Sequence, residues 1–158
     1  MRFEEIIGTL EQAFKLKLAV VQDTTVFEAV SEDGATKVRV LVQSVDEHRR
    51  VLLSADLGVP PPGSGEQLYR TMLEANNLFT ETGGATLSID AESGACRLQR
   101  HVSQDDFSGD AEARLVAFVE TALAWSRLIA DHRPSAEDGP MSPEDAMPPL
   151  GSFHIIQV

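Results

Sequence analysis

Apolar residues recur at helical spacing in three stretches of the chain, and this pattern predicts three amphipathic helices. The first runs from about residue 2 to residue 16, the second from residue 65 to residue 79, and the third begins after residue 110. Their apolar faces consist of Phe3, Ile6, Ile7, Leu10 and Phe14 in the first, Leu68, Met72, Ala75 and Phe79 in the second, and Leu115, Phe118, Ala122, Trp125 and Ile129 in the third. For the first helix two interpretations stay open: the face is core, or part of it remains open as the wall of a partner-binding groove.

Apolar and polar residues alternate in five further stretches, which predicts β-strands over residues 25–31, 37–44, 51–57, 85–90 and 95–102. Asp33-Gly34 predicts a tight hairpin between the first two strands, and a short polar turn joins the second to the third. Short connections favour antiparallel pairing. The order α-β-β-β-α-β-β-α therefore predicts an α+β domain, a single antiparallel five-stranded sheet flanked by three helices.

The composition changes at Arg133. Residues 133–146 combine prolines with acidic residues, which predicts no helix or strand longer than about one turn. The segment Phe153–Val158 is apolar and rich in residues that favour strands. We therefore expect a domain over residues 1–132, followed over residues 133–158 by an acidic, proline-rich linker and an apolar C-terminal segment.

The charge and composition of the chain limit the classes of partner that we expect it to bind. The 158 residues carry a formal net charge of −12, and because phosphate binding needs a basic face we expect no nucleic-acid partner. No apolar run approaches membrane-spanning length, and the first residues lack the basic and apolar regions of a signal peptide. The single cysteine, Cys96, fits a reducing compartment. We expect a cytoplasmic protein without membrane insertion.

No group of residues in the sequence predicts catalysis. The four histidines are predicted to lie in a turn, at a strand end, at a helix end and in the tail, and no two have the spacing of metal ligands: His48, His101, His132 and His154. Cys96 alternates with Arg97 in a predicted strand, and we interpret it as a small apolar filler. We therefore expect no catalytic residues, no cofactor and no metal site.

Several segments carry a resemblance to a known family. Residues 73–79, Leu-Glu-Ala-Asn-Asn-Leu-Phe, lead into residues 82–90, Thr-Gly-Gly-Ala-Thr-Leu-Ser-Ile-Asp, and then into Leu98-Gln-Arg. Phe118-Val-Glu-Thr-Ala follows later, with Trp125 three residues beyond it. Together with the order of elements, these segments resemble the Tir-chaperone (CesT) family, the small dimeric chaperones of bacterial type III secretion. The resemblance covers the predicted domain and not the tail.

The resemblance implies a function and two surfaces. It implies a class I secretion chaperone that binds the N-terminal segment of a secreted effector in extended form, without ATP, and keeps it soluble and secretion-competent. It implies a homodimer built on the second helix, in which Tyr69, Leu73 and Asn76 also form a second stripe that one sheet cannot cover. The residues that match the dimer interface are Leu68, Tyr69, Met72, Leu73 and Asn76. The candidates for the effector patch are Phe3, Ile7, Leu10, Phe14, Phe27 and Leu41.

Two other classes of function stay open. One is a regulatory or scaffolding protein outside secretion, which uses the same fold to bind a folded partner. The other is a small enzyme. Resistance of a bound, unstructured partner segment to proteolysis would distinguish the chaperone from the scaffold.

The tail departs from the family, whose members commonly end soon after the last helix. An apolar, β-prone segment after such a linker tends to associate with other strands. We expect it to add to a sheet edge or to fill an apolar groove, on its own protomer or a neighbouring one, in the position of an effector. The alternative is a disordered terminus.

Overall fold

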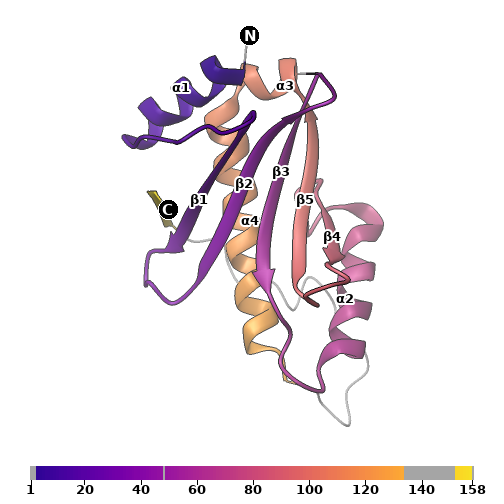
Figure 1. The fold of residues 1–158 in the computed structure, drawn as a ribbon. Coiled ribbons are helices and arrows are strands. Elements are labelled where there is room, and N and C mark those ends of the chain that lie inside the picture. Colours follow the sequence, from indigo (N-terminus) through magenta and orange to yellow (C-terminus); the bar gives the residue numbers. More distant parts are fainter. Residues whose placement is uncertain (1–2, 48, 134–151, 158) are drawn as a thin grey trace.

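The computed structural model describes residues 3–47, 49–133 and 152–157. Its helices are α1 (Phe3–Phe14), α2 (Gly65–Leu78), α3 (Gln104–Gly109) and α4 (Ala111–Asp131). Its strands are β1 (Thr24–Ser31), β2 (Lys37–Val45), β3 (Arg50–Gly58), β4 (Thr86–Ile89), β5 (Cys96–Ser103) and β6 (Phe153–Gln157). The strands form one sheet in the order β4-β5-β3-β2-β1-β6, and every neighbouring pair is antiparallel (Figure 1).

The α+β fold with one antiparallel sheet is confirmed, but the predicted numbers of strands and helices are wrong. The sheet has six strands because residues 153–157 pair with β1. Residues 104–109, between the last predicted strand and the third predicted helix, form α3, which brings the described helices to four. The hydroxyl of Ser103 caps α3 by accepting a hydrogen bond from the Asp106 N–H at 3.1 Å, and buried Phe107 anchors it in the core.

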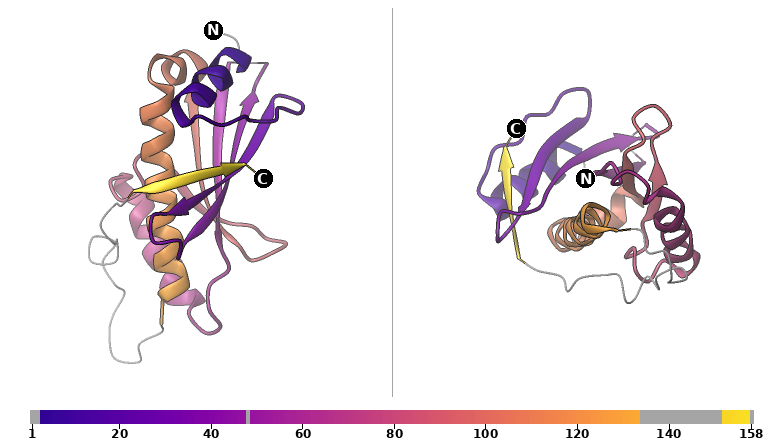
Figure 2. Two further views of the ribbon diagram at one scale, coloured as in Figure 1. Left: turned by 90° about the vertical axis from the view of Figure 1, so that its left-hand side faces the viewer. Right: turned by 90° about the horizontal axis from the view of Figure 1, so that it is seen from below.

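The core lies between α4 and the concave face of the sheet, which curves around this helix (Figure 2). Period-two alternation turns one side of each central strand inward, as the sequence predicts. The inward side chains are Val38, Val40 and Val42 of β2, and Val51, Leu53, Ala55 and Leu57 of β3. Trp125 of α4 is fully buried, and its indole N–H donates to the Glu81 carbonyl at 2.9 Å, so its polar atom is paired.

The predicted hairpin at Asp33-Gly34 is present and is tied to α4. The Asp33 carboxylate accepts hydrogen bonds from the Ser31 hydroxyl at 2.6 Å and from the Ala35 N–H at 3.0 Å. Its second oxygen accepts from the Arg127 guanidinium at 2.7 Å. These contacts, the Ser31 hydroxyl first, lower the pKa of Asp33 to about 2. The turn residue thus remains charged and joins the β1–β2 end of the sheet to the helix.

Thr25 lies on the inner face of β1, and a substitution there tests whether its buried hydroxyl is unpaired. Its side chain is buried, and its hydroxyl has no hydrogen-bond partner among the described residues. Leaving a buried hydroxyl unpaired costs about 1–3 kcal/mol, and valine has nearly the same shape. We therefore expect Thr25→Val to raise the free energy of unfolding by about 1 kcal/mol, measured by urea denaturation.

Thr24→Val is the matched control, because the Thr24 hydroxyl donates to the Gln22 carbonyl at 3.2 Å. This variant loses a hydrogen bond and should gain no stability. A Thr25→Val protein with an unchanged or lower urea midpoint would contradict the assignment of an unpaired hydroxyl.

Candidate functional site

Exposed apolar side chains gather at the two ends of the sheet. The α2–β4 patch consists of Leu73, Leu78, Phe79 and Ile89, and the β1-edge patch consists of Val20, Val21, Val26 and Ile156. Because β4 and β6 are the first and last strands of the sheet, the two patches lie at opposite ends of the molecule. Large apolar side chains exposed near one another are candidates for a binding site.

The α2–β4 patch is held in shape by one side chain. The Asn76 amide donates to the Leu87 carbonyl at 3.0 Å and accepts from the Leu87 N–H at 2.8 Å, so it pairs both backbone groups of that β4 residue. This double hydrogen bond fixes α2 beside β4 (Figure 1). At the end of the helix, Phe79 adopts a left-handed conformation, and the Gly84 N–H donates to its carbonyl at 3.0 Å.

The structure separates the five residues predicted for the dimer interface. Leu68 and Met72 lie in the core, Tyr69 is half-buried against it, and Asn76 is bonded to its own β4. Leu73 alone among the five is strongly exposed, at 70%. The exposed Leu78, Phe79 and Ile89 were missed. Phe79 falls on the core stripe of an ideal helix, but its left-handed backbone takes it off that stripe.

The six candidates for the effector patch do not form one surface. Phe3, Ile7, Leu10 and Phe27 are at most 4% exposed, because α1 covers the edge of the core with this apolar face. Only Phe14 and Leu41 remain partly exposed. Phe14 packs at the margin of the core, whereas Leu41 lies on the outer face, since its neighbours Val40 and Val42 point inward. The core interpretation of the α1 stripe therefore holds for Phe3, Ile7 and Leu10.

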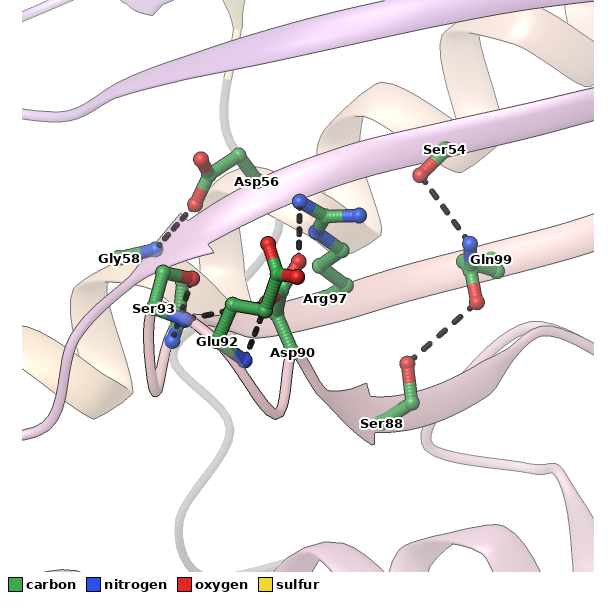
Figure 3. A network of polar contacts seen from close by, with 10 residues as sticks. Ser54, Asp56, Gly58, Ser88, Asp90, Glu92, Ser93, Arg97 and Gln99 are labelled. Carbon is green, nitrogen blue, oxygen red and sulfur yellow. Dashed lines mark hydrogen bonds and ion pairs between the residues drawn. The ribbon is translucent and has the colours of Figure 1, made fainter.

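The outer face of the sheet is polar over β3, β5 and β4 (Figure 3). Gln99 donates to the Ser54 hydroxyl at 3.5 Å and accepts from the Ser88 hydroxyl at 3.4 Å, so one side chain bridges three strands. Arg97 pairs with Asp90 at 2.6 Å in the same region. The middle of this outer face thus presents hydrogen-bonding groups.

Two titratable side chains, Cys96 and His132, have pKa values that burial shifts. Burial, with the nearby Asp56 carboxylate, raises the pKa of the Cys96 thiol to about 11, and the sulfur lies 3.7 Å from the Met72 sulfur in the core. Burial, with Arg133 beside it, lowers the pKa of His132, so this imidazole is neutral and is not the cation expected at a helix C-terminus. Within residues 3–47, 49–133 and 152–157, no three His, Cys, Asp or Glu side chains are grouped as a metal site.

None of the described helices is long and apolar enough to cross a membrane.

The model of the Tir chaperone protein (CesT) family matches residues 35–126, which is more than half of the chain. The chain belongs to the CesT family. The matched region of this CesT-family chain runs from the β1–β2 turn into α4 and leaves out α1, β1 and β6. No curated protein sequence matches it.

Two solved structures share the fold of this CesT-family chain. One is the crystal structure of the ExsC–ExsE complex, with a TM-score of 0.62 and 19% sequence identity. The other is the HopA1–SchA chaperone–effector complex, with a TM-score of 0.59 and 15% identity. Each similarity covers 82% of this chain and 94% of the other.

Proposed function

We propose that this chain is a type III secretion chaperone. It binds the N-terminal segment of a secreted effector in extended form and keeps that segment soluble and secretion-competent, without ATP. Family membership supplies the class of protein. The observation that carries the proposal is the apolar surface exposed near β1, which an extended segment covers through strand addition and side-chain pockets.

We also propose that the α2–β4 patch joins two copies of the chain. Leu73 projects from α2 on the side away from the core, and Ile89 continues the patch onto β4. A four-residue edge strand with apolar side chains on it is a site that proteins normally cover. A second copy presents the same apolar surface, so a two-fold contact buries both patches at once.

Since the second copy covers the α2–β4 patch in this arrangement, the effector binds elsewhere on the surface. Phe14 and Leu41 remain the candidates from the predicted patch, and Val20, Val21 and Val26 extend the apolar surface near β1. One of the two related structures is described as a chaperone–effector complex, which supports the same role here.

Co-expression with a secreted protein encoded beside this chain tests the function. We expect a complex that survives gel filtration without nucleotide. Limited proteolysis should leave the N-terminal segment of the partner protected, and its NMR resonances should lack the dispersion of a folded domain. A folded, protease-resistant partner would instead favour the scaffolding function, and a complex that required ATP would contradict the proposal.

Two pairs of variants locate the effector surface. We expect Phe14→Glu and Leu41→Glu each to weaken binding about tenfold or more, because each buries a carboxylate against an apolar side chain. Thr9→Glu on α1 and Gln43→Glu on β2 add the same charge at polar positions and should bind as the unmodified chain does. Affinity is measured by calorimetry, after circular dichroism has established that each variant is folded. Equal affinities for all four folded variants would exclude both candidate residues.

A further inference from the structure

The sheet ends in a strand that the chain supplies from its own C-terminal segment. β6 pairs antiparallel with β1, from Phe153 opposite Ser31 to Gln157 opposite Phe27, and the Glu32 N–H extends the ladder to the Ser152 carbonyl at 3.0 Å. Without β6, this side of β1 would be an open edge, which readily accepts another strand. The right-hand view in Figure 2 shows β6 at the end of the curved sheet, beside β1.

β6 is held by few contacts. Phe153 and Ile155 pack against the core but remain partly exposed, whereas His154, Ile156 and Gln157 are exposed. Among the described residues, no β6 side chain makes a hydrogen bond or an ion pair. The strand is therefore held by its backbone ladder and two side chains, and it is the least buried of the described strands.

The edge of β1 selects for a particular side-chain pattern. Ile155 lies opposite Ala29, whose small, fully buried side chain leaves room for a large apolar neighbour. Phe153 lies opposite Ser31, two positions along the same face. An extended segment with apolar side chains at two alternating positions therefore fits this edge.

A hollow begins where the described part of β6 ends. Gln157 contributes to its lining together with α1 and the turn that follows it, through Gly8, Glu11, Gln12, Lys15, Leu16 and Lys17. The hollow therefore adjoins the end of the β1 edge at which a strand paired with β1 passes the position of Gln157.

We propose that β6 is a resident strand that covers the β1 edge until an extended segment of the partner, apolar at alternating positions, displaces it. The proposal rests on the proposed function for the identity of the incoming segment. Because β6 belongs to the chain that it covers, the incoming segment competes with an intramolecular strand. A strand that covers the edge about 99% of the time lowers the apparent affinity of a competitor roughly a hundredfold.

The test uses the full chain and a labelled peptide of its own residues 151–158 as the probe. Ile155→Asn removes the inward contact of β6, so the β1 edge should be uncovered more of the time. The peptide should therefore bind this variant at least about tenfold more tightly than it binds the unmodified chain. Ile156→Asn is the matched control, because the same substitution at an exposed position of the same strand leaves the inward contact intact. Equal peptide affinity for Ile155→Asn and the unmodified chain would overturn the proposal.

Hydrogen exchange gives an independent readout at single amides. The Glu32 amide, which donates to Ser152, should exchange faster in Ile155→Asn and not in Ile156→Asn. The Ser44 amide, which donates to the Asp23 carbonyl at 2.9 Å between β2 and the start of β1, should be unchanged in both and serves as the internal reference. Unchanged exchange at Glu32 would mean that Ile155 does not hold the strand.

Competition then separates this proposal from the proposed function. The N-terminal segment of the co-purified partner should displace the peptide from Ile155→Asn. A partner that binds the chain without displacing the peptide would support chaperone function and overturn the assigned docking edge. The affinity for the peptide could instead depend on the concentration of the chain, with self-association of the chain detected by sedimentation. This result would mean that β6 covers β1 of a second copy and would overturn the intramolecular arrangement.

Discussion

We expect Leu73→Asp to convert the proposed homodimer into monomer. The Leu73 side chain is 70% exposed on the protomer, so the substitution leaves the protomer fold intact. In the dimer it would place a carboxylate without a partner in a desolvated contact, at a cost of about 3–5 kcal/mol. The dissociation constant should therefore rise by roughly a factor of a hundred to several thousand, measured by analytical ultracentrifugation over a concentration series.

Val21→Asp is the matched control for Leu73→Asp. Val21 is exposed to nearly the same extent, 68%, but lies in the β1-edge patch at the opposite end of the sheet. It receives the same charge and should dimerise as the unmodified chain does. If Leu73→Asp sediments with the unmodified dissociation constant, α2 does not form the interface.

We expect Asn76→Ala to lower the free energy of unfolding of the protomer more than Leu73→Asp does. The substitution removes both hydrogen bonds to Leu87 and leaves the N–H and C=O of that residue without their partner. Each unpaired, partly buried group costs about 1–3 kcal/mol, so we expect a loss of about 2–4 kcal/mol in the free energy of unfolding. Because the same bonds fix α2 beside β4, the dimer should weaken as well.

The neighbouring residue provides the control for Asn76→Ala. Asn77 is exposed on the same helix, so Asn77→Ala changes the same residue type without touching β4. Its urea midpoint should stay within the small range expected for surface substitutions. Equal midpoints for the two alanine variants would show that the Asn76 amide does not stabilise the protomer.

Much of the central sheet could be predicted because its local signals agree with the tertiary structure. The alternation of Val38, Val40 and Val42 specifies which side of β2 is buried, since a shift of one residue would turn all three toward water. Asp33-Gly34 specifies the hairpin, because the glycine adopts a positive φ of 70° without a side-chain clash. The apolar stripe of α4 was equally clear, and its five predicted residues are all buried.

The predicted surfaces depend on more than periodicity, because periodicity groups residues by face and does not say what each face meets. Leu73 and Asn76 share a stripe of α2, yet one is exposed and the other is bonded to β4. The choice depends on the position of Leu87, eleven residues further along the chain. In the same way, the apolar face of α1 is core because α4 lies against this helix, which the sequence of α1 does not state.

The sequence by itself determined the strands, the helices with regular apolar faces, the acidic character of the chain and the tendency of residues 153–158 to form a strand. These properties follow from side-chain period and composition, which are local. The tertiary structure decided which sheet edge that strand joins, which apolar residues stay exposed and that Cys96 and His132 are buried and uncharged. Each of these depends on contacts between residues far apart in the chain, and only the folded backbone brings those residues together.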